Sequence, residues 1–212
     1  MITFGLPKGR NLGPARDALA AAGVGLADLD ASRLRQRFSG EELLGVELEV
    51  LLLKDWDLPL YVEHGIVDCA IVGSDVLEET QPDVFQPLRL RDGRSRLSLI
   101  AETPQLPRRS GQLRAATRYP AWAARLLAAR NLHVEVLHLT SSIELGPLLD
   151  LTDVAVDIVQ TGTTLRTHDL HEVEILAQVA PTFVVNRASF HAYRRRLSRL
   201  LGALEEAEAA GD

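Results

Sequence analysis

Short apolar runs alternate along the chain with segments in which apolar residues recur every three or four positions. The first pair is a strand over 2–6, followed by a helix that begins near Leu12 and that Gly23 ends. Alternating strands and helices of this kind are typical of α/β layering with mostly parallel strands. The pattern therefore predicts an α/β fold.

The same periodicities predict the remaining elements. Further strands are expected over 47–53, 68–72, 97–101, 113–117, 133–138, 154–159 and, with a break at Pro181, 174–185. Further helices are expected from Gly73, with Asp75 as the cap, and over 59–65, 120–130, 144–149 and 188–210. The last helix is expected to be amphipathic, with one face formed by Leu197, Leu200, Leu201 and Leu204.

A polar stretch with proline and glycine over 103–111 is expected to be a surface loop, and a second set of strands and helices follows it. Two small lobes with a cleft between them fit this pattern better than one sheet. Lobe I is expected to comprise residues 1–92 and 180–212, including the C-terminal helix. Lobe II is expected to comprise residues 93–179.

Composition narrows the class of protein. The net charge is −6, from 29 acidic and 23 basic residues, which disfavours a general nucleic-acid binder. The apolar runs are far shorter than the ~20 residues that span a bilayer, so no membrane span is expected. Cys69 is the only cysteine, and the N-terminus lacks the pattern of a secretory signal. We therefore expect a globular protein of the reducing cytoplasm.

The strongest local signal for chemistry is the segment 156–166, where a buried strand is expected to run into a loop of small hydroxylated residues. Gly162 allows the backbone to approach an anion closely, and the threonines of the loop add hydroxyl donors. Asp157 suits a ribose, because a carboxylate accepts hydrogen bonds from two neighbouring hydroxyls and repels phosphate. The alternative is a simple helix N-cap in a strand-to-helix turn.

Basic residues gather at another strand end, in the segment 6–10. Lys8 is a mobile point charge and Arg10 a planar fork, and both suit phosphate oxygens near the start of a helix. Arg33 and Lys54 are weaker candidates of the same kind. Taken alone, each of these residues also fits a solvated surface cation. The six histidines lack convincing metal-ligand spacing, and no G-x-S-x-G elbow indicates a serine hydrolase.

Taken together, these motifs resemble the ATP phosphoribosyltransferase family. The blocks that carry the resemblance follow one another over nearly the whole chain: Leu6–Arg10, Asp57–Pro59, Tyr61–Gly65, Ile71–Leu77, Ala116–Pro120, Glu144–Leu148, Asp157–Arg166 and Val185–Ser189. Their number and order make the resemblance specific. It implies the two-lobed fold of the type II periplasmic binding proteins.

The resemblance also implies an activity, the first step of histidine biosynthesis. The 5-phosphoribosyl group of phosphoribosyl pyrophosphate is transferred to N1 of ATP, pyrophosphate leaves, and no covalent enzyme intermediate is needed. Magnesium is expected to bind mainly through the substrates' own phosphates rather than in a protein site. The chain resembles the short form of the family, whose members dimerise and work in a hetero-oligomer with a regulatory subunit that resembles histidyl-tRNA synthetase.

Site residues follow from the resemblance by motif. Arg10 and Arg33 are implied to be catalytic, because they match positions that balance charge on the departing pyrophosphate. The residues implied to bind substrate are Lys8, Lys54, Glu144, Asp157, Thr161, Gly162, Thr163, Thr164 and Leu165. The loop 161–165 would hold the 5-phosphate, and the two acidic residues would lie near the ribose. Two positions depart from the family pattern: Lys54, where relatives commonly have arginine, and the segment Thr140–Ile143.

Two alternatives remain beside this hypothesis. A non-catalytic cytoplasmic small-molecule binding module of the same two-lobed fold would need an output element, and the sequence shows no separate helix-turn-helix segment. A different phosphoribosyltransferase would share the phosphate loop, but the segments 8–10 and 61–65 favour ATP.

Overall fold

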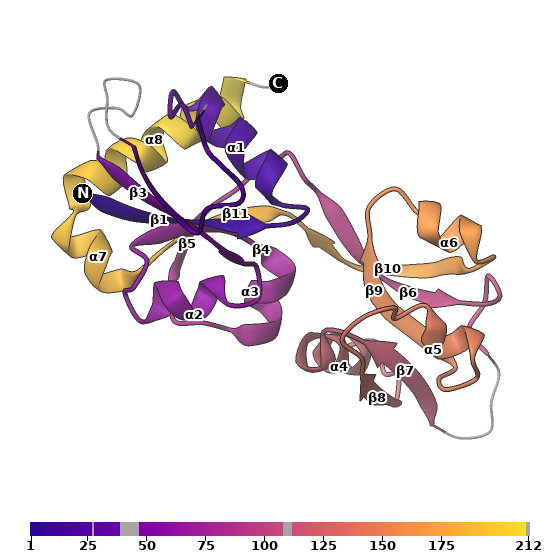
Figure 1. Ribbon diagram of the computed structural model, residues 1–212. Helices are drawn as coiled ribbons and strands as arrows, with labels where there is room; N and C mark the ends of the chain where they lie inside the picture. Colours follow the sequence, from indigo (N-terminus) through magenta and orange to yellow (C-terminus); the bar gives the residue numbers. More distant parts are fainter. Residues whose placement is uncertain (27, 39–46, 108–111, 211–212) are drawn as a thin grey trace. The chain divides into compact units, whose positions relative to one another are not determined.

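A computed structural model describes residues 1–26, 28–38, 47–107 and 112–210 (Figure 1). The chain divides into two compact units, one formed by Met1–Gly93 with Ala180–Asp212 and the other by Arg94–Val179. Gly93 therefore lies in the first unit, one residue beyond the boundary expected from the sequence. The second unit is contiguous in sequence, whereas the first is assembled from both ends of the chain.

The described part of the first unit contains a sheet of six strands in the order β2-β3-β1-β4-β11-β5. Its strands are β1 (Ile2–Lys8), β2 (Arg35–Phe38), β3 (Leu48–Lys54), β4 (Cys69–Gly73), β5 (Phe85–Arg89) and β11 (Pro181–Val185). The central strand β1 runs parallel to β3 and β4, while β2, β11 and β5 pair antiparallel with their neighbours. The carboxyl ends of β1, β3 and β4 consequently lie at one edge of the sheet.

Helices cover both faces of this sheet (Figure 1). They are α1 (Leu12–Ala21), α2 (Leu58–Glu63), α3 (Ser74–Thr80), α7 (Arg187–Ala192) and α8 (Arg194–Ala210). Leu19 of α1 and Leu197 of α8 share one buried cluster with Phe4 and Phe183 of the sheet. A second cluster joins α2 and α3 to β4 and β11. The apolar residues that recur along these helices thus pack against the sheet.

Two details of the helices differ from the sequence expectation. The helix expected over 188–210 is broken at Tyr193, which ends α7 before α8 begins at Arg194. Asp75 is not the cap of α3: Gly73 occupies that position, and Asp75 lies buried in the first helical turn. The carboxylate of Asp75 is held by Arg10 instead.

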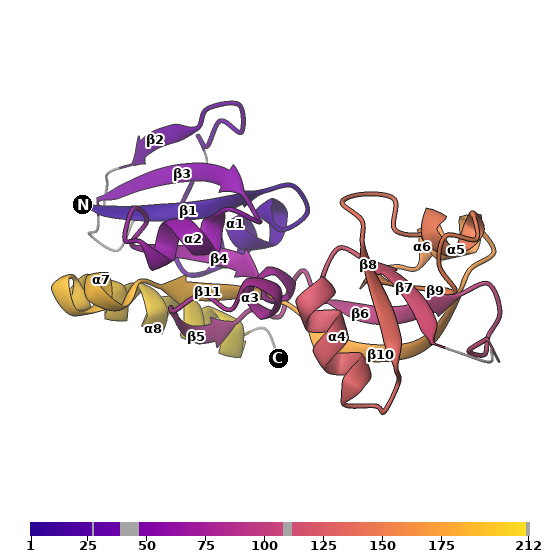
Figure 2. The same ribbon diagram turned by 90° about the horizontal axis from the view of Figure 1, so that it is seen from below.

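The described part of the second unit contains a five-stranded sheet in the order β10-β6-β9-β7-β8 (Figure 2). Its strands are β6 (Ser95–Ala101), β7 (Leu113–Thr117), β8 (Val134–His138), β9 (Val154–Val159) and β10 (His171–Val179). Its helices are α4 (Pro120–Ala128), α5 (Leu145–Leu148) and α6 (Thr163–Thr167). The central strand β9 is parallel to β7 and antiparallel to β6.

Both sheets are mixed, so the expectation of mostly parallel strands was wrong. The described parallel pairs are β1–β3, β1–β4, β7–β8 and β7–β9, and the other described pairs are antiparallel. The periodicity did not predict β2 and β5, which are edge strands without a buried residue. Polar edge strands lack the apolar alternation on which such predictions depend.

Within the described ranges, no helix combines the length and apolarity that a membrane crossing requires. Residues 103–107 of the expected surface loop form no helix or strand, and residues 108–111 lie outside the part that the structure describes.

Candidate functional site

The threonine- and glycine-rich segment forms a tight connection between β9 and α6 in the second unit. Gly162 has a φ of +73° and is the N-cap residue of α6. Such a left-handed conformation costs a residue with a Cβ about 1–2 kcal/mol, which explains the glycine. Leu165 is buried and anchors the helix, whereas Thr161, Thr163 and Thr164 are exposed. The loop therefore presents hydroxyl groups to solvent on a fixed base.

Arg166 folds back over this loop. Its guanidinium donates to the Thr161 carbonyl at 3.2 Å and to the Thr163 hydroxyl at 3.1 Å. The hydroxyls of Thr161 and Thr163 are 3.0 Å apart. A cation thus lies within the expected anion-binding loop. Sequence reasoning did not assign it a role, although its spacing of three from Thr163 places the two side chains on neighbouring helical positions.

Below the loop, Arg96 of β6 and Glu172 of β10 form a bidentate ion pair. The Arg96 Nε and Nη2 atoms donate to the two Glu172 carboxylate oxygens at 2.5 and 2.6 Å, and the Ser98 hydroxyl donates to the same carboxylate at 2.6 Å. Arg96 also donates to the carbonyl of Gln160, the first loop residue, at 3.3 Å. Sequence reasoning missed this network because its members lie up to 76 positions apart.

The hydrogen bonds from Arg96 lower the pKa of Glu172, against an opposing effect of burial, and Ser98 adds to the lowering. A carboxylate with a depressed native pKa contributes stability above its unfolded pKa, about 4.3, and loses it as the pH falls through the native value. We therefore expect acidification below pH ~4.3 to reduce the free energy of unfolding less in Glu172→Gln than in the wild-type chain. Urea denaturation at a series of pH values measures this difference, and parallel profiles would contradict it.

The two acidic residues expected near the ribose also belong to the second unit. Asp157 is half-buried on β9, opposite Ser98 of β6 in the strand register. Glu144 is half-buried at the N-cap position of α5. It directly follows Thr140–Ile143, the segment whose sequence differs from the family pattern. The two residues therefore lie on separate elements of one unit. Their roles toward a ribose remain predictions.

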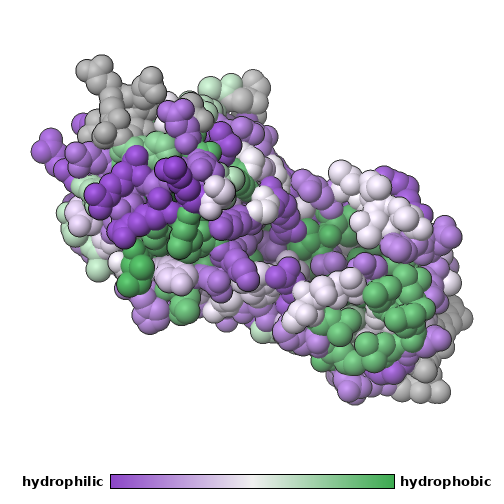
Figure 3. Space-filling view, viewed as in Figure 1, coloured by the Kyte–Doolittle hydropathy of each residue, from purple (hydrophilic) through white to green (hydrophobic). Residues whose placement is uncertain are grey.

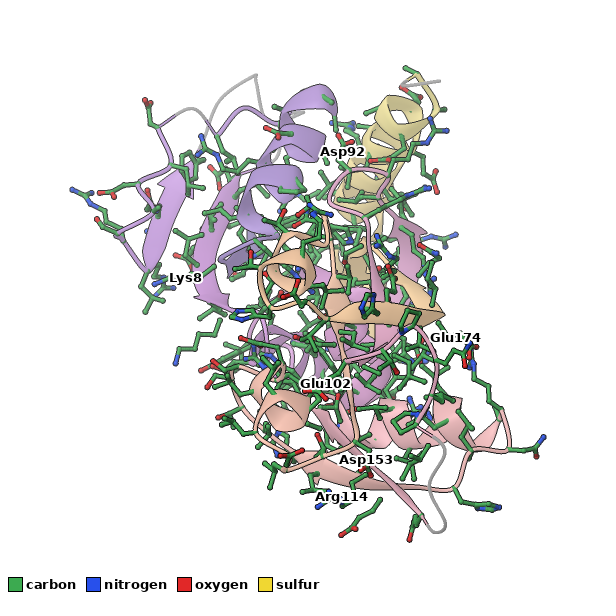
Figure 4. The ribbon with its side chains drawn as sticks, turned by 90° about the vertical axis from the view of Figure 1, so that its right-hand side faces the viewer. Lys8, Asp92, Glu102, Arg114, Asp153 and Glu174 are labelled. Atoms are coloured by element: carbon green, nitrogen blue, oxygen red, sulfur yellow. The ribbon has the colours of Figure 1, made fainter. Side chains whose placement is uncertain are left out.

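In the first unit, basic side chains gather at the carboxyl ends of the parallel strands. Lys8, labelled in Figure 4, ends β1. It lies opposite Lys54, the last residue of β3, and both residues are exposed. Arg10 follows in the loop before α1, and its side chain is 37% exposed. Two neighbouring ammonium groups repel each other, and a bound anion would relieve this repulsion. The topology thus brings three of the candidate cations to one edge of the sheet.

Arg10 is held by an acidic residue, Asp75, that sequence reasoning did not include in the site. Its Nη2 donates to Asp75 Oδ2 at 2.5 Å, and the Asp75 side chain is only 2% exposed. A Cβ at position 73 would lie 2.2 Å from Asp75 Oδ1, so only glycine allows this carboxylate its place. The guanidinium is therefore fixed on one side while part of it stays open to solvent.

Asp55 connects three strand ends of the same edge. Its carboxylate accepts from the Asn11 side chain at 2.8 Å and from the Gly73 backbone N–H at 3.4 Å. Burial and the neighbouring charge of Asp75 raise the pKa of Asp55, and the two donors and Arg10 offset part of this rise. Asp55 fixes the start of α1 relative to the end of β4, and thereby the loop that carries Arg10.

Arg33 lies just before the edge strand β2. Because β2 runs antiparallel to β3, with Arg35 opposite Leu51, Arg33 lies at the same edge of the sheet as Lys54. It is exposed and pairs with Asp30 at 3.3 Å. With Arg35 and Arg37 it lines a surface depression of about 500 Å³. Topology therefore places Arg33 at the same edge of the sheet as Lys54 and Lys8, on the side of the edge strand β2.

No group of three or more His, Cys, Asp or Glu side chains in the described ranges is placed to hold a metal ion. The carboxylates of the site are already engaged with arginines or with backbone donors, as Glu172 and Asp55 show. This donor set suits a cation that arrives with its own phosphate ligands better than a cation caged by protein.

The architecture, two α/β units each built on a mixed sheet, is shared with other proteins of known structure. The periplasmic aliphatic sulphonate binding protein SsuA from Escherichia coli aligns with 98% of this chain and 72% of its own, with a TM-score of 0.62. Their 11% sequence identity makes this a likeness of fold alone.

The family follows from closer relatives. The family model described as "HisG: ATP phosphoribosyltransferase" matches residues 54–206, and the chain belongs to this family. The ATP phosphoribosyltransferase of Deinococcus radiodurans is 40% identical over 98% of this chain and 91% of its own. The ATP phosphoribosyl transferase (HisG:HisZ) complex from Thermotoga maritima aligns over 100% of both chains, at 26% identity and a TM-score of 0.79.

Proposed function

We propose that the β9–α6 loop and the cation cluster around Arg10 carry out the reaction of the family to which the chain belongs. This reaction transfers the 5-phosphoribosyl group of phosphoribosyl pyrophosphate to N1 of ATP, as the first step of histidine biosynthesis. The family match carries the proposal, together with the two strand-end sites that supply groups for a phosphate and for a pyrophosphate.

The second unit would bind the phosphoribosyl end of the substrate. Backbone N–H groups and hydroxyls of the loop 161–165 would hold the 5-phosphate, since Gly162 keeps the backbone accessible. Glu144 and Asp157 would accept hydrogen bonds from the ribose hydroxyls, as carboxylates do at such sites.

The first unit would supply cations for the leaving pyrophosphate. Arg10 offers a planar fork held by Asp75, and Lys8 and Lys54 add point charges at the same edge. Lys54 cannot give the bidentate contact of an arginine, so Arg10 takes the larger share. Arg33, paired with Asp30 just before β2, would add a further positive charge at the edge of the sheet that carries Lys54.

The chemistry needs positioning more than covalent catalysis. The lone pair of adenine N1 attacks the anomeric carbon, the bond to pyrophosphate breaks, and its electron pair leaves on the pyrophosphate oxygen. Positive charge develops on the ribose ring as negative charge collects on the leaving group. The residues of this chain hold the two reactants in line and stabilise that negative charge. Magnesium, bound through the substrate phosphates, would supply further charge neutralisation.

We also propose that the chain works as a dimer within a hetero-oligomer that contains a regulatory subunit. The Thermotoga maritima structure contains HisG together with HisZ. An apolar patch on the second unit supports such assembly (Figure 3), because exposed apolar patches mark protein contacts. Leu145, Leu149 and Leu151 are exposed apolar residues of this unit, and Leu149 is 70% exposed. The expected compartment is the cytoplasm, where the buried Cys69 thiol would stay reduced.

An assay of product formation tests the proposal. Purified chain is mixed with ATP, phosphoribosyl pyrophosphate, magnesium and pyrophosphatase, with and without a synthetase-like regulatory subunit, and phosphoribosyl-ATP is measured. Product in either mixture supports the proposed reaction, and a histidine effect that requires the second subunit places regulation there. A folded chain that binds ligand and forms no product in either mixture would favour a binding module.

We expect Gly162→Ala to raise the KM for phosphoribosyl pyrophosphate by about tenfold. Position 162 has a φ of +73°, which strains a residue with a Cβ, so the loop backbone would shift to relieve the strain. The matched control is Gly202→Ala in α8, where a Cβ meets nothing within 4 Å and helix propensity improves. Steady-state kinetics separates the two variants, and an unchanged KM in Gly162→Ala would exclude close backbone approach to the phosphate.

A further inference from the structure

A fixed network lies beneath the phosphate loop, and none of its members was assigned a role above. Arg96 is 29% exposed and Glu172 23% exposed, and their bidentate pair joins strands β6 and β10. Ser98 adds a third contact to the Glu172 carboxylate. The guanidinium of Arg96 therefore has one defined orientation, with a remaining donor free to reach the loop.

That remaining donor, Nη1, contacts the carbonyl of Gln160 at 3.3 Å. The next carbonyl along the chain, that of Thr161, is held by Arg166 at 3.2 Å. In a trans peptide the C=O and the following N–H point in opposite directions. Two arginines that hold consecutive carbonyls thus direct the N–H groups of Thr161 and Gly162 away from the guanidinium groups, where an anion can accept from them.

We propose that Arg96 is a positioning residue for phosphoribosyl pyrophosphate, which orients the Gln160–Thr161 peptide so that the loop N–H groups face the 5-phosphate. Glu172 and Ser98 act indirectly: Glu172 fixes the guanidinium of Arg96, and Ser98 holds the carboxylate of Glu172. The inference rests on the proposed function of the loop. Arg96 would affect the affinity for phosphoribosyl pyrophosphate, and would not contact ATP or the reacting atoms.

The chain offers a matched control on the same strand. Glu174 lies two residues from Glu172 on β10 and accepts from Arg130 at 2.5 Å (Figure 4). Arg130 also donates to the carbonyls of Leu126 and Leu176, and none of the hydrogen bonds of this pair within the described part of the chain involves the loop. Glu172→Gln and Glu174→Gln each remove one charge from an arginine–glutamate pair on β10, and only the first pair reaches Gln160.

The test measures binding of phosphoribosyl pyrophosphate, with magnesium, to the full chain by calorimetry, and the KM values for both substrates. We expect Arg96→Lys and Glu172→Gln to weaken phosphoribosyl pyrophosphate binding by about tenfold or more while the KM for ATP changes less than twofold. Glu174→Gln should match the wild-type chain in both. Equal binding by all variants, or an equal loss in Glu172→Gln and Glu174→Gln, would overturn the proposal.

Thermal unfolding of each variant separates positioning from folding. A shift of the KM ratio with an unchanged transition supports the positioning role, whereas equal losses for both substrates with a lowered transition indicate a structural role only. The binding measurement does not depend on turnover. A wild-type chain that bound phosphoribosyl pyrophosphate and made no phosphoribosyl-ATP would overturn the proposed reaction, and the comparison of Kd values would still decide the role of Arg96.

Discussion

Arg10→Ala is expected to lower kcat for phosphoribosyl-ATP formation by about 10²–10³-fold, the usual cost of losing one group that stabilises charge in a transition state. The guanidinium is fixed by Asp75 on one side and 37% exposed, so it can face an anion without reorganising. Initial rates at saturating concentrations of both substrates measure the effect. Arg10→Lys keeps the charge and loses the planar fork, so its kcat should lie between those of the wild-type chain and Arg10→Ala.

Arg10→Ala also lowers the stability of the fold, and a double variant separates this loss of stability from the loss of turnover. Arg10→Ala removes the ion pair to Asp75, whose side chain is 2% exposed. Breaking a fully buried pair costs about 3–5 kcal/mol, and we expect about 1–2 kcal/mol here because Arg10 is partly exposed. The double variant Arg10→Ala/Asp75→Asn should regain stability without regaining turnover. Wild-type turnover in a folded Arg10→Ala chain would exclude the proposed role of this residue.

Phe183→Ala is expected to lower the free energy of unfolding of the first unit by about 3–5 kcal/mol, as for other large aromatic residues removed from a core. Phe183 and Phe4 are both 0% exposed, and their rings stack with centroids 6.2 Å apart. Phe183→Leu retains most of the volume and should lose less. Leu60→Ala, at a site that is 56% exposed on α2, should change stability by less than about 1 kcal/mol.

The two tryptophans allow the first unit to be followed by itself. Trp56 belongs to the first unit and Trp122 to the second. In a Trp122→Phe background, fluorescence during urea denaturation reports on the surroundings of Trp56. An unchanged midpoint for Phe183→Ala in this background would show that the Phe4–Phe183 contact contributes little to the stability of the first unit.

Local sequence patterns were sufficient to predict the strands and helices that carry the candidate site residues. The strand that precedes Gly162 spans Val154–Val159, as its apolar run predicted, and the helix after Arg10 begins at Leu12. The break expected at Pro181 was also correct, since β10 ends at Val179 and β11 begins at Pro181. These features depend on residues close in sequence, where backbone preferences and apolar spacing act directly.

The ion pair of Asp75, the contacts of Asp55 and the strand directions depend on pairing between segments far apart in the sequence, which residue spacing does not predict. Asp75 has the residue type and position of a helix cap, but the guanidinium of Arg10 arrives from 65 positions away and takes its carboxylate. Asp55 has no local signal, because its partners Asn11 and Gly73 are brought to it by the sheet. The mixed direction of the strands likewise follows from how distant segments pair.

The position of β11 within the first sheet affects the order in which the protein can fold during synthesis. This strand lies between β4 and β5, yet it leaves the ribosome only after the whole of Arg94–Val179. The second unit is contiguous and can form while synthesis continues, whereas the first sheet stays divided until residues 181–185 emerge. The N-terminal strands must therefore wait for the C-terminal part of the chain, which leaves β4 and β5 with unpaired edges in the nascent protein.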